Sequence, residues 1–355
     1  MPRLFDPLTV RSIQFKSRVF VSPMCQYSCA IDGLATPWHL VHLGRFALGG
    51  AALVFTEATA VSPVGRISPH DLGLWSEAHV QALAPIAAYI DARGAVPGVQ
   101  LAHSGRKGST AVPWKGAKAV APADGGWTPV APSALAFSPT YPEPAALDAS
   151  GMAAVVADFV RAAKRAGEAG FRVIELHMAH GYLLHEFLSP LTNRRDDEWG
   201  GSFEGRTKLP LEVASAVRAA WPAALPLFVR ISATDWVEGG WDLQQSVRLA
   251  ALLRDRGIDL VDCSSGGLVP NAEIPVGPGY QVPFARAVRK GAPIATGAVG
   301  MITDPAQADE IIASGSADAV LLARAMLRDP NWALHAARAL GVDVPWPVQF
   351  ERAKV

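Results

Sequence analysis

The chain has 355 residues, 50% of them hydrophobic, and 32 Lys plus Arg balance 32 Asp plus Glu. This length fits one large α/β domain with a sizeable core. The balanced charge gives no electrostatic reason to expect nucleic acid or a membrane as a partner. No apolar run reaches the roughly 18 residues of a membrane-spanning helix, and the first residues lack a signal-peptide pattern, so we expect a cytoplasmic protein.

The three cysteines are Cys25, Cys29 and Cys263. An odd and small number in a long chain argues against a disulfide framework and indicates a reducing compartment. It also falls short of the four thiolates that usually hold an iron–sulfur cluster.

Short apolar segments alternate with helix-like segments along the chain. The strand candidates show little polar alternation, which is typical of parallel strands buried on both faces. In chain order they are residues 18–21, 52–56, 96–101, 173–176, 227–231, 260–263, 294–296 and 319–322. The helix candidates carry apolar residues at three- and four-residue spacing. In chain order they are residues 76–93, 151–169, 206–220, 243–256, 305–314 and 331–340.

Eight strands alternating with helices predict a single α/β domain over residues 1–355, a closed (β/α)8 TIM barrel. An open doubly wound sheet is the alternative with the same alternation. No G-x-G-x-x-G opens a helix after the first strand, so the usual dinucleotide fingerprint is missing and the barrel is favoured.

Two segments lie outside this alternation. Residues 103–150 follow the third strand, are rich in Pro, Gly, Ala and Trp, and are too long for an ordinary loop. We expect them to form an excursion over the barrel mouth. Residues 344–355 begin with a stiff, apolar stretch around Trp346. We expect this C-terminal tail to dock on the barrel or on a neighbouring subunit.

The chemistry of such a barrel lies at the carboxyl ends of its strands. Polar or glycine residues follow every strand candidate there. The segments are residues 22–27, 57–59, 100–103, 177–182, 230, 264–267, 297–300 and 323–324.

The last two strand ends resemble a phosphate site. In these barrels the loops after strands seven and eight often bind phosphate through backbone N–H groups. Gly300 allows close backbone approach, and Arg324 supplies a planar fork of donors. The alternative is that the glycines only turn the chain and Arg324 makes a surface ion pair.

His177, His180 and Tyr182 follow an otherwise apolar strand. Two neutral imidazoles can donate to one oxygen, and a tyrosine hydroxyl can supply a proton. A zinc site is one alternative, with a third ligand from His185 or a distant carboxylate, although H-E-x-x-H is absent. Hydrogen-bonded core histidines are another. We expect no metal.

Other catalytic patterns are weak or missing. Cys25 alone is more often an inert small hydrophobe than a functional group. The sequence has no G-x-S-x-G elbow and no lysine directly at a strand end for Schiff-base chemistry.

These residues together resemble the Old Yellow Enzyme family of FMN-dependent reductases, in its bacterial thermophilic-like branch of NADPH dehydrogenases and xenobiotic reductases. The blocks S-P-M-C-Q-Y and H-x-x-H-G-Y are the most specific. The matching segments are residues 4–8, 22–27, 57–61, 100–107, 175–190, 199–202 and 349–352. The resemblance covers essentially the whole chain.

The resemblance implies a non-covalently bound FMN. Cys25 would lie near the reactive edge of its ring, Gln100 would bond the pyrimidine edge, and Arg230 would stand beside N1, where a cation stabilises reduced flavin. The residues implied at the cofactor are Ser22, Pro23, Met24, Cys25, Ala58, Gln100, Arg230, Gly300, Ala323 and Arg324. The last three would hold the phosphate.

The resemblance also implies the substrate side of the site. His177 and His180 would bind the carbonyl oxygen of the substrate, Tyr182 would donate a proton, and Tyr27 would shape the pocket. Arg352 would reach the active site of a neighbouring subunit in a homodimer or homotetramer. The implied activity is ping-pong reduction of electron-poor alkenes, such as α,β-unsaturated ketones and aldehydes, with NADPH as reductant.

Three alternatives to this activity stay open. Larger flavin barrels act on dienoyl-CoA thioesters or amines, but they carry an iron–sulfur cluster and an extra domain. A non-catalytic flavin or phosphate-binding barrel and a metal-dependent hydrolase are the other two.

The chain departs from the pattern of its implied relatives at a few positions. Ala323 replaces a frequent glycine, where the backbone N–H still serves if φ is negative. Trp199 and Phe350 each stand where a tyrosine is frequent, residues 353–355 lack the usual Gly-aromatic ending, and Cys29 is an additional thiol.

Overall fold

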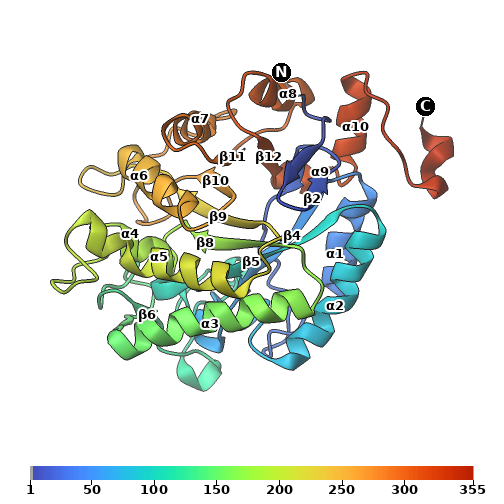
Figure 1. The fold of residues 1–355 in the computed structure, drawn as a ribbon. Coiled ribbons are helices and arrows are strands. Elements are labelled where there is room, and N and C mark those ends of the chain that lie inside the picture. The colour runs from blue at the N-terminus through green and yellow to red at the C-terminus, as the bar shows by residue number, and fades with distance from the viewer. Residues whose placement is uncertain (1–2, 355) are drawn as a thin grey trace.

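The computed structural model describes residues 3–354 and contains a closed barrel of eight parallel strands (Figure 1). The barrel strands are β3 (Val19–Val21), β4 (Leu53–Ala60), β5 (Val96–Ala102), β8 (Val173–Met178), β9 (Leu227–Ser232), β10 (Leu260–Ser264), β11 (Ala295–Ala298) and β12 (Ala319–Leu322). The last strand pairs with the first, Val320 opposite Val19, and closes the barrel. All eight strand predictions are confirmed, and this closure rules out the open sheet.

Helices surround the barrel. They are α1 (Pro37–Leu48), α2 (Glu77–Ala92), α3 (Ala149–Glu168), α4 (Leu183–Leu188), α5 (Phe203–Ala220), α6 (Leu243–Arg254), α7 (Val282–Gly291), α8 (Pro305–Ala313), α9 (Arg324–Arg328) and α10 (Trp332–Ala339). The six predicted helices are confirmed. The prediction missed α1, α4, α7 and α9, of which α4 and α9 are too short to show a helical period.

Four of these helices begin at a side chain that accepts a hydrogen bond from the first turn. The capping residues are Asp148, Ser202, Asp242 and Asp304. Such caps satisfy backbone N–H groups that have no partner within the helix. They explain why these helices begin within a few residues of their predicted start.

A hairpin closes the amino-terminal end of the barrel. Its strands, β1 (Leu8–Val10) and β2 (Ile13–Phe15), are antiparallel. Phe15 packs on Phe20 and Phe228 inside the barrel, with ring centroids 4.8 and 6.4 Å apart. The prediction missed this hairpin, because three-residue strands give only a weak alternation of buried residues.

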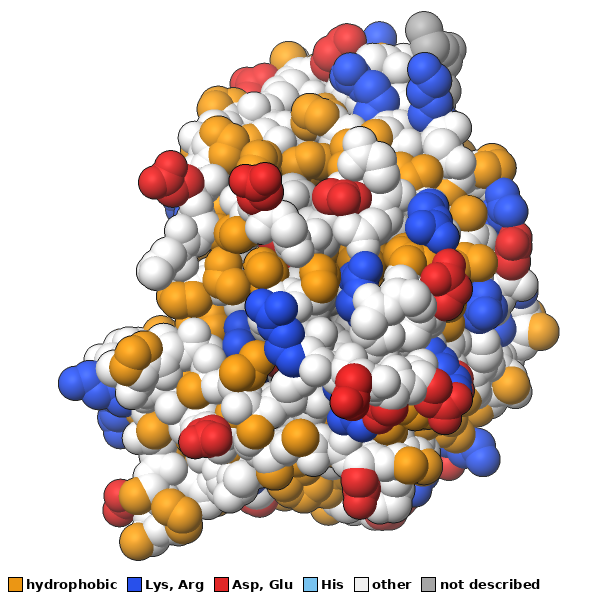
Figure 2. Space-filling model, turned by 90° about the vertical axis from the view of Figure 1, so that its left-hand side faces the viewer, with side chains coloured by type: hydrophobic (Ala, Val, Ile, Leu, Met, Phe, Trp, Pro, Cys, Tyr) orange, Lys and Arg blue, Asp and Glu red, His pale blue; other side chains and the backbone are white. Residues whose placement is uncertain are grey.

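The excursion after β5 reaches the barrel mouth. Its elements are the 3-10 turns η2 (Gly105–Lys107), η3 (Pro113–Lys115) and η4 (Pro122–Asp124) and the strand pair β6 (Val130–Ala131) and β7 (Ala145–Ala146). Trp114 meets Tyr27, beyond the end of β3, edge to face with centroids 5.8 Å apart. The molecular face that carries α4, α6 and β6 shows hydrophobic side chains and a group of Lys or Arg side chains near its middle (Figure 2).

The C-terminal tail is only partly in contact with the barrel. Residues 344–349 border a cavity of about 420 Å³ together with residues such as Leu48 and Leu334. The following 3-10 turn, η5 (Val348–Ala353), contains no buried residue and extends past α10 (Figure 1). The expected docking on the chain's own barrel therefore does not extend to the turn that carries Arg352. Within residues 3–354, no helix combines the length and hydropathy of a membrane span.

Candidate active site

Polar side chains cross the interior of the barrel at its carboxyl end. His177 of β8, Arg230 of β9 and Asp262 of β10 are neighbours in register. Register partners on adjacent parallel strands point to the same face of the sheet. Arg230 Nε lies 3.1 Å from Asp262 Oδ2. From its other end, Arg230 Nη1 donates to Ser22 Oγ at 2.9 Å, which links β9 to the strand end on the opposite wall.

A second polar pair lies beside this row. Gln100 Nε2 donates to Glu175 Oε1 at 2.7 Å, and Glu175 Oε2 is buried without a hydrogen-bond partner among the described residues. Burial raises the pKa of Glu175 and of Asp262, and the Arg230 cation opposes the rise in both. Two carboxyls thus share one cation, and Gln100 and Arg230 each carry N–H groups beyond those used in these contacts.

The rings of His177, His180 and Tyr182 converge. The centroid of His177 lies 5.1 Å from that of His180 and 5.0 Å from that of Tyr182, nearly perpendicular to each. His177 Nδ1 accepts from the backbone N–H of Ala179 at 3.3 Å, so its proton sits on Nε2. His180 Nε2 lies 2.7 Å from Ser264 Oγ at the end of β10.

Burial sets the protonation state of these rings. It lowers the pKa of His177 and His180 well below the ordinary value, and the Arg230 cation adds to the effect. Burial also raises the pKa of Tyr182 well above its usual range. The group therefore presents neutral imidazole N–H donors and an intact phenol at neutral pH.

The loop after β3 carries Cys25 into the mouth. Its backbone is held where Gln26 N–H donates to Glu57 Oε2 at 2.8 Å, and Glu57 Oε1 lies 3.2 Å from His39 Nε2. Burial raises the pKa of the Cys25 thiol well above its usual range, and hydrogen bonding to Ala58 and Tyr27 offsets only part of that rise. Cys25 is thus a neutral thiol. Cys29 is buried, with Sγ 3.7 Å from His39 Nε2.

The proposed phosphate residues gather at the ends of β11 and β12. Gly300 has φ of +114°, and a Cβ there would stand 2.6 Å from Gln281 Nε2 and 3.0 Å from the Tyr280 ring. Burial raises the pKa of Tyr280, and the Arg324 cation opposes this rise. Ala323 has φ of −108°, which meets the condition set for a backbone N–H donor at this position.

Arg324 is exposed and makes no ion pair with any residue from 3 to 354. This contradicts the surface ion pair considered as the alternative. A guanidinium without an ion-pair partner can hold an oxyanion, and the missing Cβ at Gly300 leaves the backbone open to close approach.

Several residues at the mouth were not predicted. Lys107 Nζ donates to the backbone oxygens of His180, at 2.7 Å, and of Gly267, and lies over the Tyr182 ring at 5.5 Å. Burial lowers the pKa of Lys107 to about 7. Gln281 Oε1 accepts from Ser265 Oγ at 2.7 Å. These residues lie in segments beyond the strand ends. The available sequence signals were therefore their positions within segments that match the family or close to glycines.

The structure also bears on the zinc alternative and on the position of Arg352. His185, one of the two candidates for the third ligand of a zinc site, has both ring nitrogens in other contacts, with the Gly181 N–H and with Asp235. Among residues 3–354, no group of three or more His, Cys, Asp or Glu side chains is placed to hold a metal. Arg352, on the exposed turn η5, is not brought together with the other predicted residues within this chain.

Comparison with known proteins identifies the family. Residues 3–342 match the NADH:flavin oxidoreductase / NADH oxidase family. The NADPH dehydrogenase of Bacillus subtilis is 45% identical over 351 residues, covering 99% of this chain and 98% of the relative. The chain belongs to the Old Yellow Enzyme family of flavin oxidoreductases. The NADPH dehydrogenase of Listeria monocytogenes serovar 1/2a is 46% identical and covers 99% of both chains.

Solved structures agree with this membership. Morphinone reductase superposes with a TM-score of 0.80 at 28% identity, over 98% of this chain and 91% of its own. The old yellow enzyme homologue from Zymomonas mobilis has a TM-score of 0.78 at 26% identity, over 98% and 95%. The protein is therefore a flavin-dependent NAD(P)H oxidoreductase. The barrel mouth described above lies at the carboxyl ends of the strands, where barrels of this kind carry their active sites.

Proposed function

We propose that the protein is an ene-reductase that uses FMN and NADPH to reduce the activated C=C bond of α,β-unsaturated ketones, aldehydes and related electron-poor alkenes in a ping-pong cycle. One observation carries the proposal. Two neutral imidazoles and an undissociated phenol converge on one space at the barrel mouth. This is the donor set that a developing enolate needs, with hydrogen bonds for its oxygen and a proton for its α-carbon.

The residues present fit FMN. Gln100 and Arg230 offer N–H groups toward a polar ring edge, and Ser22 through Cys25 and Ala58 would line the ring. Gly300, Ala323 and Arg324 offer the backbone and the free cation that a phosphate monoester requires. When bound, FMN supplies hydride transfer between NADPH and the alkene.

The protein's own groups perform the remaining steps. His177 Nε2–H donates to the substrate oxygen, since Nδ1 already accepts from Ala179. His180 can donate from Nδ1 when Nε2 accepts from the Ser264 hydroxyl. Tyr182 then gives its phenolic proton to the α-carbon. Nearby Lys107 supports the charge that remains on the Tyr182 oxygen.

An anaerobic visible spectrum tests the reaction class. Flavin absorbance should bleach on addition of NADPH and return on addition of 2-cyclohexenone. A flavin that bleaches but does not return would contradict alkene reduction. A colourless protein that FMN cannot reconstitute would contradict the cofactor.

The Tyr182→Phe variant tests the proton donor. It should slow reoxidation by the enone by roughly 10²–10⁴-fold, the range of general-acid catalysis, and leave flavin reduction by NADPH unchanged. Tyr89→Phe, on α2 outside the barrel, is the matched control and should change neither half-reaction. Equal losses in both half-reactions of Tyr182→Phe would remove the proton-donor role.

Phenol binding tests the oxygen site. Phenolates resemble the enolate oxygen, so His177→Ala should weaken phenol binding by about ten- to a hundredfold, the effect of one hydrogen bond to a charged group. The dissociation constant is read from the flavin spectrum. Unchanged affinity would contradict the His177 contact.

We also propose that the protein is a homodimer or homotetramer in which Arg352 completes the site of a neighbouring subunit. Support comes from the exposure of the tail turn, where Val348 and Phe350 leave apolar surface in solvent. Analytical ultracentrifugation of the full chain tests this. A monomer at micromolar concentration would contradict it.

A further inference from the structure

The turn between His180 and Tyr182 has an unusual backbone. His180 has φ of +58° and Gly181 has φ of +71°, so two consecutive residues are left-handed. A residue other than glycine rarely adopts this conformation, and the conformation persists only where its surroundings hold it. The turn sets the direction of both the His180 ring and the Tyr182 hydroxyl.

Side chains from three other elements hold this turn. The His180 N–H donates to Ser232 Oγ at 2.9 Å, and Lys107 Nζ donates to the His180 carbonyl at 2.7 Å. The Gly181 N–H donates to His185 Nδ1 at 2.9 Å. Side chains of β9, of the excursion and of α4 thus form hydrogen bonds with the backbone of the left-handed pair.

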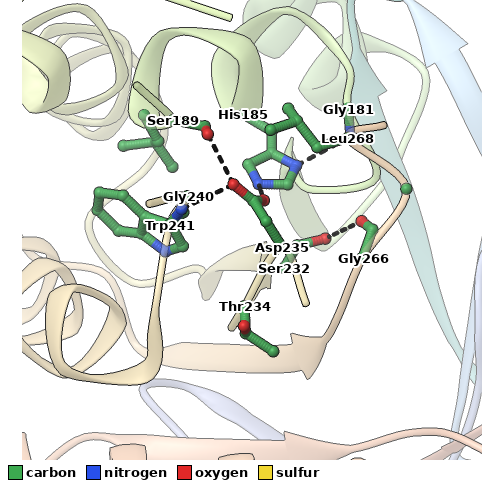
Figure 3. A network of polar contacts seen from close by, with 12 residues as sticks. Gly181, His185, Ser189, Ser232, Thr234, Asp235, Gly240, Trp241, Gly266 and Leu268 are labelled. Carbon is green, nitrogen blue, oxygen red and sulfur yellow. Dashed lines mark hydrogen bonds and ion pairs between the residues drawn. The ribbon is translucent and has the colours of Figure 1, made fainter. Parts of the chain in front are cut away.

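His185 is itself fixed by a buried carboxylate, as Figure 3 shows. His185 Nε2 lies 2.9 Å from Asp235 Oδ1, and both side chains are 0% exposed. The other carboxylate oxygen of Asp235 accepts from Ser189 Oγ at 2.6 Å and from the Trp241 N–H at 2.7 Å. Two hydrogen-bond donors and the His185 ring therefore converge on this one carboxylate.

The charge state of Asp235 follows from these partners. Burial alone would raise its pKa, but His185, Ser189 and Trp241 outweigh burial, and the pKa lies below the usual range. Asp235 is therefore an ionised acceptor, and His185 must carry its proton on Nε2. Nδ1 is then left without a proton, which is the state that accepts the Gly181 N–H.

We propose that His185 and Asp235 are positioning residues for the reaction. By fixing one imidazole tautomer, they hold the left-handed His180–Gly181 turn and so aim His180 and Tyr182 at the substrate. The consequence for alkene reduction rests on the proposed function, whereas the effect on the turn does not. Neither residue touches the reacting atoms.

The Asp235→Asn variant tests the tautomer. The Trp241 N–H can only donate, so the asparagine oxygen faces Trp241 and its NH2 group faces His185. His185 Nε2 must then accept, its proton moves to Nδ1, and two N–H donors oppose each other at Gly181. The side chain keeps its shape, and the charge is removed. Ser189→Ala is the matched control, since it removes one donor to Asp235 and leaves the tautomer unchanged.

Amide hydrogen exchange at Gly181, followed by NMR on the FMN-loaded protein, is the direct readout. Asp235→Asn should lose protection at Gly181, and Ser189→Ala should keep it. Asp235→Asn should also slow reoxidation of the flavin by 2-cyclohexenone roughly ten- to a hundredfold, which is the loss that a displacement of up to about 1 Å can bring. It should also weaken phenol binding.

Two substitutions of His185 separate its contact with Gly181 from its contact with Asp235. In His185→Asn the amide oxygen occupies the place of Nδ1 and can accept from Gly181. In His185→Gln the amide nitrogen occupies the place of Nε2 and can donate only to Asp235. Protection of Gly181 and the reoxidation rate should therefore be retained better in His185→Asn than in His185→Gln.

Two results would overturn the proposal. One is native Gly181 protection and native reoxidation in folded Asp235→Asn and His185→Gln. The other is the same loss of Gly181 protection in Ser189→Ala as in Asp235→Asn. If the unmodified protein fails to reduce the enone, the proposed function falls, while Gly181 exchange still decides whether the pair holds the turn. If His185→Gln does not fold, the contrast between Asp235→Asn and Ser189→Ala decides.

Discussion

Gly181→Ala gives a sharp test of how the barrel mouth is packed. A Cβ at Gly181 would stand 2.3 Å from the backbone oxygen of Gly267 and 2.8 Å from Leu268 Cα. Both obstacles are backbone atoms, so no side-chain rotation relieves the clash. The loop after β10 and the turn after β8 must move apart to accommodate one methyl group.

The exposed Gly201 offers a matched control. Its φ of +63° is close to the +71° of Gly181, but a Cβ there would meet nothing within 4 Å. The left-handed conformation costs alanine about 1–2 kcal/mol, and the reduced freedom of the unfolded chain returns about 0.4–1 kcal/mol. Gly201→Ala should therefore lower the free energy of unfolding by about 1 kcal/mol. Overpacking adds about 1–3 kcal/mol in Gly181→Ala.

Urea unfolding of both variants measures this difference. Gly181→Ala should be less stable than Gly201→Ala by about 1–3 kcal/mol. Enone reduction should fall roughly ten- to a hundredfold in Gly181→Ala alone, because its displaced turn carries Tyr182. Equal stability loss in the two variants, or full activity of Gly181→Ala, would refute the close contact between the two loops.

Arg324→Ala should weaken FMN binding by about ten- to a hundredfold and make the binding less sensitive to salt, whereas Arg328→Ala on the same helix should change neither property. Flavin fluorescence titrations at two ionic strengths measure FMN affinity in the two variants, and equal effects would contradict the phosphate contact. Burial raises the pKa of Glu186 to about 8 from an ordinary 4.5, so the folded state binds an extra proton and loses stability as pH rises through that interval. Glu186→Gln should remove this component, and an unchanged pH dependence of unfolding between pH 5 and 9 would contradict it. Arg352→Ala should raise KM for the enone about tenfold, the effect of one charged hydrogen bond, without slowing flavin reduction; an unchanged KM would argue against the tail contact.

The barrel could be predicted because each strand can be recognised from its own short stretch of sequence. Each is a short run of apolar residues that no solvent-facing pattern interrupts, and helices with a clear period separate them. The hairpin at residues 8–15 and the short helices α4 and α9 escaped, since three to six residues are too few to show a period. Tertiary packing, not local pattern, stabilises them.

The residue types at the mouth also follow from the order of elements along the chain. Alternation of strand and helix places the carboxyl ends of all strands on one side of the barrel, so His177, His180 and Tyr182 are expected on the same side as Arg230 and Gly300. Resemblance to known blocks supplied their roles at the flavin. It also proposed a backbone role for Ala323, whose φ of −108° meets the condition set for it.

The hydrogen-bond and ion-pair partners of these side chains depend on the three-dimensional fold. The His180 ring contacts Ser264, which lies 84 positions away in the sequence, and Lys107, 73 positions away, donates a hydrogen bond to the His180 carbonyl. Asp235 sets the tautomer of His185 from a loop that no motif marks. Such contacts depend on how neighbouring parallel strands align and how loops fold back over them. Sequence spacing does not encode that alignment, because each strand's neighbours are chosen by closure of the whole barrel.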